Sequence, residues 1–368
     1  MADEERLWQR RCRRLWEWLG ERPVEAALIV VPANVRYLTG FTGDSTYLLV
    51  ASGVAIAISD GRYEQQLQEE CPGLELVIRG TTGEPMEEAV GRAVRRIGAG
   101  RIGYEPHGLT CDRFQRLQMA LPGIDWQPME QVVEQLRAVK DAEEIGRIRE
   151  AIAVAERAIG AALEQVDLRA QPTECRFAGV LNMCMRELGA EDEAFETIVA
   201  CGARAALPHA RLSRTARLRL EHGVLCDWGA RVEGYVSDLT RLIAGPKIAA
   251  PLQRLVDAVL AARDAAIARL RPGVPARSVD AEARKVLDEA GFGRFFKHST
   301  GHGIGLEVHE APLLRPNSDV ELRSGMVVTI EPGVYLPGRY GVRIEEDVLV
   351  TEQGPEVLTS LPPVIVLT

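Results

Sequence analysis

Three histidines stand in one glycine-rich stretch, HSTGHGIGLEVHEAP, which runs from His298 to Pro312. They are His298, His302 and His309, in a chain that has six histidines in all. Imidazole nitrogens serve as metal ligands and as groups that exchange protons near neutral pH. The interleaved glycines let backbone come close to a bound group. The stretch therefore raises the possibility of a metal or catalytic site, whose other members must lie elsewhere in the chain.

A pair of aspartates is predicted in the segment GVLCDWGARVEGYVSDLTRLIAG, residues 223–245. Two strand-like runs flank RVEG, and a loop centred on Val232 and Glu233 places Asp227 directly opposite Asp238. Their Cβ atoms would then lie about 4.5–5.5 Å apart. Like charges in that position destabilise a sheet unless a cation lies between them.

A pair of glutamates is predicted in the same way. A three-residue loop, Pro337 to Arg339, places Glu331 opposite Glu345. Both acid pairs lie in largely apolar runs, where unpaired charge is costly. Two divalent cations balance the four carboxylates, and one of the histidines supplies a nitrogen ligand. Such an oxygen-rich set favours Mn²⁺, Co²⁺, Fe²⁺ or a carboxylate-bound Zn²⁺.

Each of these residues alone has an ordinary interpretation. A single acid is more often a solvated strand residue, and a glycine-flanked histidine is often only part of a turn. His107 and His222 are interpreted as ordinary histidines without a role in the site. The two facing acid pairs together are what favours the metal site.

Composition limits the class of protein. The 368 residues are 46% hydrophobic and 26% charged, which is typical of a soluble globular chain. The net charge of −9 argues against nucleic-acid binding. Seven cysteines without a CxxC motif indicate reduced thiols, and the N-terminus lacks a signal peptide, so we expect a cytoplasmic protein. Residues 8–19 predict an amphipathic surface helix, for which packing on a sheet is favoured over membrane contact.

The order of the predicted elements indicates two domains. Short apolar runs alternate with helical stretches over residues 26–126, which predicts a small α/β domain. A long helix with one apolar stripe is predicted from about Leu136, so we place the domains at 1–135 and 136–368. The second domain is predicted to contain two halves, each with two helices followed by β-rich sequence. Gly189 and Gly291 end the second helix of each half. This order predicts an internal duplication.

Several motifs resemble those of the creatinase/methionine-aminopeptidase, or pita-bread, superfamily, and within it the Xaa-Pro peptidases. They are VPANVRYLTGFTGDSTYLLV, SDGRYEQQ, LRAVKDAEEIGRIREA, ALPHA, CDWGARVEGYVSDLTR, HSTGHGIGLEVHEAP, VVTIEPGVY and GVRIEEDVLVT. The resemblance covers nearly the whole chain. It implies an α/β chain of two domains, a creatinase-like N-terminal α/β domain and a pita-bread α+β catalytic domain with a pseudo-two-fold duplication. It also implies a homodimer.

The same resemblance implies roles for particular residues. Asp227 would bind one metal ion, Asp238 and Glu345 would bridge two ions, and His302 and Glu331 would complete the second. Glu331 would also shuttle protons. The implied substrate-binding residues are His209, His298, His309, Tyr335 and Arg343, with His209 and His309 also acting on the developing oxyanion. For Tyr335 and Arg343 a purely structural role remains an equal alternative.

The resemblance implies a hydrolase that removes an N-terminal residue preceding proline and uses two ions, Mn²⁺ or Co²⁺ before Zn²⁺ or Fe²⁺. A C–N hydrolase or lyase on the same scaffold and a metal-free binding module are the alternatives. Upstream of ALPHA the chain reads ACGARA where the family often has a Ser-x-Pro-Asn-like stretch, so we expect its local substrate contacts to differ from the family's. Prolidases usually carry an arginine directly after the HExP segment; here that position is Leu313, and the nearest arginine is Arg315. We therefore expect an aminopeptidase P-like preference for longer peptides.

Overall fold

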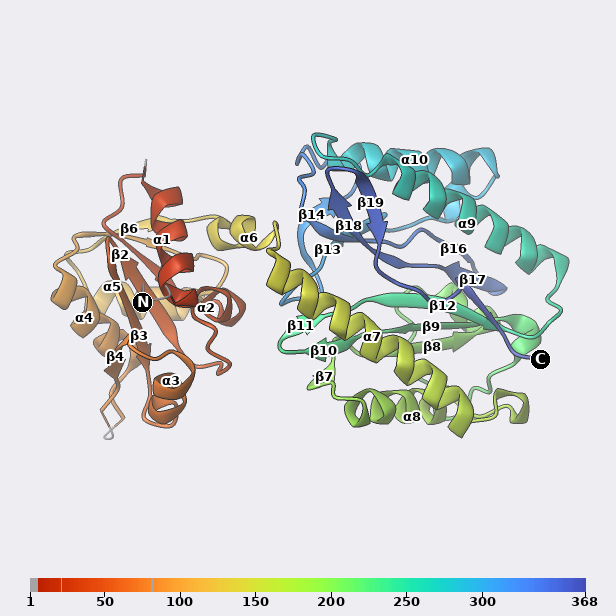
Figure 1. Cartoon of the computed structure of the whole chain (residues 1–368), viewed down its shortest axis with the longest axis horizontal. Coiled ribbons are helices and arrows are strands. Elements are labelled where there is room, and N and C mark those ends of the chain that lie inside the picture. Colours follow the sequence, from red (N-terminus) through yellow and green to blue (C-terminus); the bar gives the residue numbers. More distant parts are fainter. Residues whose placement is uncertain (1–5, 21, 81–82) are drawn as a thin grey trace, which may run out of the picture. The chain divides into compact units, whose positions relative to one another are not determined.

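The chain forms two compact units, residues 1–137 and 138–368, in a computed structural model (Figure 1). The structure describes residues 6–20, 22–80 and 83–368. The sequence-based boundary, after residue 135, falls two residues before this division. Each unit has its own core and is described by itself.

The first unit is built on a six-stranded sheet in the order β4-β3-β2-β1-β5-β6. The central strands β1, β2 and β3 pair antiparallel, and β4, β5 and β6 join in parallel. The strands are β1 (Ala26–Ile29), β2 (Tyr47–Ala51), β3 (Val54–Ser59), β4 (Glu75–Ile78), β5 (Arg101–Tyr104) and β6 (Asp125–Pro128).

The helices of the first unit follow the predicted apolar patterns. The N-terminal helix α1 buries Cys12, Leu15 and Leu19 and packs mainly against α2 and also against β2, so packing inside the unit accounts for its apolar stripe. Helix α4 ends at Gly98, whose φ of 70° places it in the left-handed region. The helices are α1 (Leu7–Leu19), α2 (Pro32–Thr39), α3 (Glu64–Glu70), α4 (Met86–Ile97), α5 (Cys111–Ala120) and α6 (Val132–Arg137).

The second unit opens with a helix that starts later than predicted. Helix α7 begins at Ala142, because Asp141 caps it: the Asp141 carboxylate accepts from the Glu144 N–H at 3.0 Å, and the Glu144 carboxylate accepts from the Asp141 N–H at 2.9 Å. The sequence-based start near Leu136 was wrong, because α6 and this cap divide the stretch. The helices are α7 (Ala142–Gln165), α8 (Glu174–Glu187), α9 (Ala250–Arg269) and α10 (Ala276–Glu289), with short 3₁₀ turns at Leu168–Ala170, Gly202–Ala206, Leu220–His222 and Gly293–Phe295.

The strands of the second unit repeat after each helix pair. The larger sheets have the orders β20-β12-β9-β8 and β14-β13-β15-β18-β19, and smaller ones have the orders β11-β10-β7 and β16-β17. The strands are β7 (Asp192–Glu193), β8 (Ile198–Cys201), β9 (Val224–Trp228), β10 (Ala230–Val232), β11 (Tyr235–Val236), β12 (Leu239–Ala244), β13 (Gly301–Gly303), β14 (Glu310–Leu314), β15 (Val327–Ile330), β16 (Gly333–Leu336), β17 (Tyr340–Arg343), β18 (Glu346–Thr351), β19 (Gly354–Val357) and β20 (Val364–Val366).

The helix pairs cover the strands from two sides, α9 and α10 on one and α7 and α8 on the other (Figure 1). Each pair has its own apolar core with the neighbouring strands. In the first half, the fully buried Trp228 donates its indole N–H to the Ala155 carbonyl of α7 at 2.9 Å. Gly189 and Gly291, which follow α8 and α10, have φ of 106° and 79°. The repeated order of elements confirms the predicted duplication.

Candidate metal centre and active site

A cavity of about 410 Å³ opens in the second unit, and strands from both halves line it. Both predicted acid pairs reach it. Of the five candidate substrate-binding residues, all but Tyr335 line it. The predicted residues on its wall are His209, Asp227, Asp238, His298, His302, His309, Glu331, Arg343 and Glu345.

The aspartates are positioned by a turn that differs from the predicted one. Glu233 and Gly234 form a two-residue hairpin turn with φ of 46° and 82°. Positive φ at both central residues is the geometry of a type I′ turn. The resulting register places Asp227 opposite Thr240, so the prediction that Asp227 directly faces Asp238 was wrong by two residues. The two aspartates still share a face, because the shift is even.

The glutamates lie in the predicted register. Strand β16 pairs with β17 around the loop Pro337 to Arg339, and Gly333 lies opposite Arg343. On the other side, Ile330 lies opposite Glu346 in the pairing of β15 with β18. Glu331 and Glu345, which lie between these pairings, therefore face each other.

The backbone approaches very closely around His302, as its flanking glycines predict. A Cβ atom on Gly301 would lie 1.9 Å from the Thr329 carbonyl oxygen, and one on Gly303 would lie 2.2 Å from that of Ala311. No side chain fits at these distances, so only glycine allows β13 to pass between its neighbours. The His302 Nε2 lies 3.4 Å from a Glu331 oxygen and 3.7 Å from an Asp238 oxygen.

The arrangement of oxygen and nitrogen donors fits a metal centre. Ligand atoms of Asp238, His302 and Glu345 lie within 4.8 Å of one another, and all three residues are buried. Asp227 adds a buried oxygen, Oδ1, which has no hydrogen-bond partner in the described part of the chain. Buried polar atoms are normally paired. An unpaired carboxylate oxygen beside this cluster is what a bound cation would explain.

The electrostatics of the site also favour a cation. Burial, and then the neighbouring acids, raise the pKa of Asp238 well above its ordinary range. Glu345 follows the same pattern, and burial raises the pKa of Glu331 to about 8. Arg343, whose guanidinium pairs with Asp227, compensates only part of this charge. The cluster must therefore take up protons or hold further positive charge.

The other predicted residues form a second group beside the acids. The rings of His302 and His309 lie 4.4 Å apart. The Tyr335 hydroxyl accepts from Arg343 at 2.8 Å and lies 2.9 Å from the His298 Nε2. Burial lowers the pKa of His298 and of His302 to about 4, so both imidazoles are neutral at pH 7. Tyr335 reaches the cavity only through these contacts.

The ordinary histidines lie outside the cavity wall. The His107 Nε2 lies 2.9 Å from Glu134 in the first unit. His222 lies in a 3₁₀ turn before β9. Sequence reasoning assigned no role to several other wall residues, although Pro208, Ala210, Ser299 and Val308 lie within the quoted motifs ALPHA and HSTGHGIGLEVHEAP. The wall residues missed are Phe195, Glu196, Ile198, Pro208, Ala210, Arg211, Ser299 and Val308.

Comparison with known proteins shows the family. Residues 146–352 match the model of metallopeptidase family M24, and residues 11–139 match that of the creatinase/prolidase N-terminal domain. The chain belongs to metallopeptidase family M24 and carries both domains, as its motifs implied. It is therefore a hydrolase of the metallopeptidase class. No helix in the described ranges has the length and apolar character needed to span a bilayer.

Relatives of known structure align along nearly the whole chain. An Xaa-Pro dipeptidase from Bacillus anthracis is 35% identical, with a TM-score of 0.91 over 98% of this chain and 100% of that one. An X-Pro aminopeptidase from Thermotoga maritima is also 35% identical, with a TM-score of 0.87 over 97% and 100%. An Xaa-Pro dipeptidase from Pyrococcus horikoshii is 32% identical over 95% of this chain and 96% of its own length.

Proposed function

We propose that the protein is a dinuclear metallopeptidase that hydrolyses the bond between an N-terminal residue and a following proline. The observation that carries this proposal is a group of four carboxylates and one imidazole on a single cavity wall, all buried except the partly buried Glu331, with Asp227 Oδ1 left unpaired. The similar Xaa-Pro dipeptidases and X-Pro aminopeptidase support the choice of bond.

The ligand assignment is the one that the motifs imply, and the shared cavity wall supports it. Asp227 would hold one ion, His302 and Glu331 would hold the other, and Asp238 and Glu345 would be shared by both. When bound, divalent ions in such a site polarise a carbonyl group and lower the pKa of water. Carboxylates dominate the donor set, which suits Mn²⁺ or Co²⁺. Metal analysis of the purified protein, with a ratio of two ions per chain expected, tests this assignment.

The remaining residues act on the peptide. Glu331 takes a proton from the attacking water and passes it to the leaving proline nitrogen. His309 and His209, both exposed at the cavity, donate to the oxygen on which negative charge develops. His298 is held by the Tyr335 hydroxyl and by its own contact with the Ser299 carbonyl, and it lines the proline side.

The subsite beyond proline distinguishes between peptide lengths. Leu313 lies on the cavity wall, opposite His302 in the pairing of β13 with β14. Arg315 is exposed, follows the end of β14 and does not line the cavity. A leucine cannot pair with the free carboxylate of a dipeptide, and without a guanidinium fixed at this position that carboxylate gains little there. We therefore assign an aminopeptidase P-like preference.

The test compares kcat/KM for an Xaa-Pro dipeptide, tripeptide and pentapeptide that share one N-terminal residue, with Mn²⁺ and with Co²⁺. Cleavage of the longer peptides at least as fast as the dipeptide supports the preference. If the enzyme cleaves only the dipeptide, a cationic side chain at a position other than 313 must bind the dipeptide's free carboxylate. A peptide of the same length without proline serves as the control for bond specificity.

The cellular setting is part of the same proposal. The scattered free cysteines support a cytoplasmic protein. A homodimer is the expected assembly, and light scattering on the purified protein determines it directly.

A further inference from the structure

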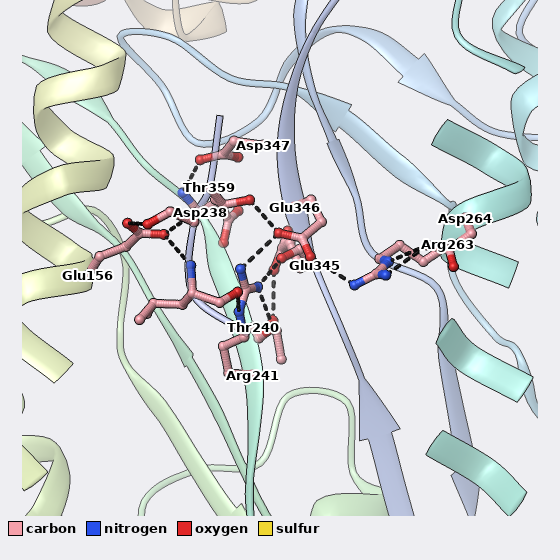
Figure 2. A network of polar contacts seen from close by, with 12 residues as sticks. Glu156, Asp238, Thr240, Arg241, Arg263, Asp264, Glu345, Glu346, Asp347 and Thr359 are labelled. Atoms are coloured by element: carbon pink, nitrogen blue, oxygen red, sulfur yellow. Dashed lines mark hydrogen bonds and ion pairs between the residues drawn. The ribbon is translucent and has the colours of Figure 1, made fainter. Parts of the chain in front are cut away.

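A buried polar network lies behind the ligand cluster and takes no part in the proposed chemistry (Figure 2). Its centre is an ion pair between Arg241 of β12 and Glu346 of β18, 2.8 Å apart, whose side chains are 0% and 6% exposed. The other Glu346 oxygen pairs with Arg263 of α9 at 3.0 Å. The Thr359 hydroxyl donates to the same carboxylate.

Arg241 uses its guanidinium to hold main chain. One terminal nitrogen donates both to its neighbour's carbonyl, that of Thr240, at 3.1 Å and to the Glu345 carbonyl. The Nε donates to the Leu361 carbonyl at 3.2 Å. The remaining terminal nitrogen meets Glu346. A planar fork with several fixed donors can make all these contacts at once, whereas an ammonium group cannot.

Two of the contacted carbonyls belong to a junction between sheets. Strands β12 and β18 lie in different sheets and are not paired with each other. Where they meet, the Glu345 N–H donates to the Thr240 carbonyl at 3.2 Å, and the Thr240 hydroxyl donates to the Glu345 carboxylate at 2.7 Å. Arg241 joins the same two residues. The position of Glu345 therefore depends on this junction.

The other proposed bridging ligand is held in a reciprocal way. The main-chain N–H of Asp238 donates to the Asp347 carboxylate at 3.1 Å. Thr240 stands two residues after Asp238, and Asp347 stands two residues after Glu345. Thr240, two residues after Asp238, thus contacts Glu345, and Asp347, two residues after Glu345, contacts Asp238. The separation between the two carboxylates is set by contacts between the halves, which Arg241 reinforces.

Stability alone is a weak reason for the buried ion pair. Apolar residues of similar volume often replace such a pair without loss, because removing two charges from water is costly. Arg241, however, donates hydrogen bonds to the Thr240 and Glu345 carbonyls, which an apolar side chain cannot do. Groups that orient metal ligands from behind typically change metal affinity about 10–100-fold when they are removed.

We propose that Arg241 is a positioning residue for the metal pair. It holds the Glu345 main chain against that of Thr240, and Glu346, anchored by Arg263 and Thr359, holds the guanidinium in place. The inference rests on the proposed assignment of Glu345 as a bridging ligand. Binding of Mn²⁺ to the full chain, measured by calorimetry after chelator treatment, separates the two ideas. A wild-type chain that binds no Mn²⁺ would overturn the ligand assignment itself and, with it, the role of Arg241.

The first variants are Arg241→Met and Arg241→Lys, with Arg149→Met as the matched control, because Arg149 forms an exposed ion pair with Glu356 in the same unit. We expect Arg241→Met to weaken Mn²⁺ binding at least about 10-fold. Arg241→Lys should give an intermediate loss, and Arg149→Met none. The kcat of Arg241→Met should recover toward the wild-type value at saturating Mn²⁺, which a general loss of structure would not allow.

Folding is monitored on the metal-free variants by circular dichroism and thermal unfolding. A cooperative Arg241→Met variant with wild-type Mn²⁺ affinity would overturn the inference, even if its melting temperature is lower. If that variant does not fold, Glu346→Gln decides, because it keeps the arginine and removes the charge that anchors it. Weaker Mn²⁺ binding by Glu346→Gln supports the role of the network, and unchanged binding refutes it.

Discussion

Arg343 pairs with one carboxylate oxygen of Asp227 and leaves the other, Oδ1, buried without a hydrogen-bond partner in the described part of the chain. The arginine therefore fixes the orientation of the acid without using all of its capacity to bind a cation. The same guanidinium donates to Tyr335 at 2.8 Å and to the Thr240 hydroxyl at 3.1 Å. One side chain thus connects Asp227 and Thr240 on one side with Tyr335 on the other.

Asp238→Ala should abolish activity and reduce bound metal while the protein stays folded. Asp238 is the acid that the assignment places between both ions, and its pKa is raised well above the ordinary range by burial and by its acidic neighbours. Metal content by elemental analysis and turnover of an Xaa-Pro peptide measure the two effects. Asp257→Ala, which removes an exposed carboxylate on α9 away from this network, is the control. Full turnover with two ions bound would refute the assignment.

His309→Ala should lower kcat and kcat/KM together and leave the metal content unchanged. The loss expected for one donor to a developing oxyanion is about 10²–10³-fold. His222→Ala removes the same kind of side chain outside the cavity and should have no effect. Loss of metal in His309→Ala would identify this residue as a ligand instead.

Leu313→Arg should shift the preference toward dipeptides. The new guanidinium would face the position of a dipeptide's free carboxylate, and a hydrogen bond to a charged group contributes enough to favour the dipeptide about 10-fold. The ratio of kcat/KM for a dipeptide and a pentapeptide measures the shift. Arg315→Ala should leave the wild-type ratio unchanged, and a large drop in dipeptide cleavage in that variant would show that Arg315 already binds the carboxylate.

The stability of the metal-free protein should fall as the pH rises from about 6.5 to 8. Burial raises the pKa of Glu331 from 4.5 to about 8, so the folded state binds a proton that the unfolded state has lost. The stabilisation is complete at pH values below the Glu331 pKa of the unfolded state. It is lost as the pH rises through the Glu331 pKa of the folded state. His298 and His302 act only at lower pH, because their pKa values fall from 6.5 to about 4.

Urea unfolding in the presence of a chelator, at pH 6.5, 7.2 and 8, measures this slope. Glu331→Gln should make the slope shallower, because the amide does not titrate; the raised pKa values of Asp238 and Glu345 should keep part of the slope. Saturating Mn²⁺ should also flatten it in the wild-type chain, since bound cations replace the protons. A wild-type slope that Glu331→Gln leaves unaltered would show that other groups are responsible.

The sequence carried enough information for one acid pair and not for the other. The loop Pro337 to Arg339 is symmetric between two regular strands, so counting outward from it places Glu331 opposite Glu345. The first hairpin turns instead at Glu233 and Gly234, and Glu233 is a non-glycine residue with positive φ. Type I′ turns are signalled by Asn-Gly, Asp-Gly or Gly-Gly, and the Glu-Gly pair found here carries only the glycine of that signal.

Other parts of the site could not be read from local patterns. Thr240, Arg241 and Asp347 contact the proposed ligands across a junction between sheets, and no periodicity within one strand encodes such a contact. The apolar wall at Phe195 and Ile198 likewise depends on how distant segments meet. The helices were more predictable, because caps and apolar stripes are local. Only the start of α7 was misplaced. The chain leaves the helical conformation after α6, and a new helix begins after the capping residue Asp141.

The parallel pairing of β20 with β12 has a consequence for synthesis. A ribosome releases the chain from its N-terminus at about 5–20 residues per second, and earlier domains fold first. Asp227 and Asp238 emerge long before residues 364–366, so one edge of β12 stays open during much of translation. Open strand edges pair readily with other chains. In the interval between the synthesis of β12 and that of β20, this edge is therefore open to pairing with other chains, and a chaperone acting then would protect it.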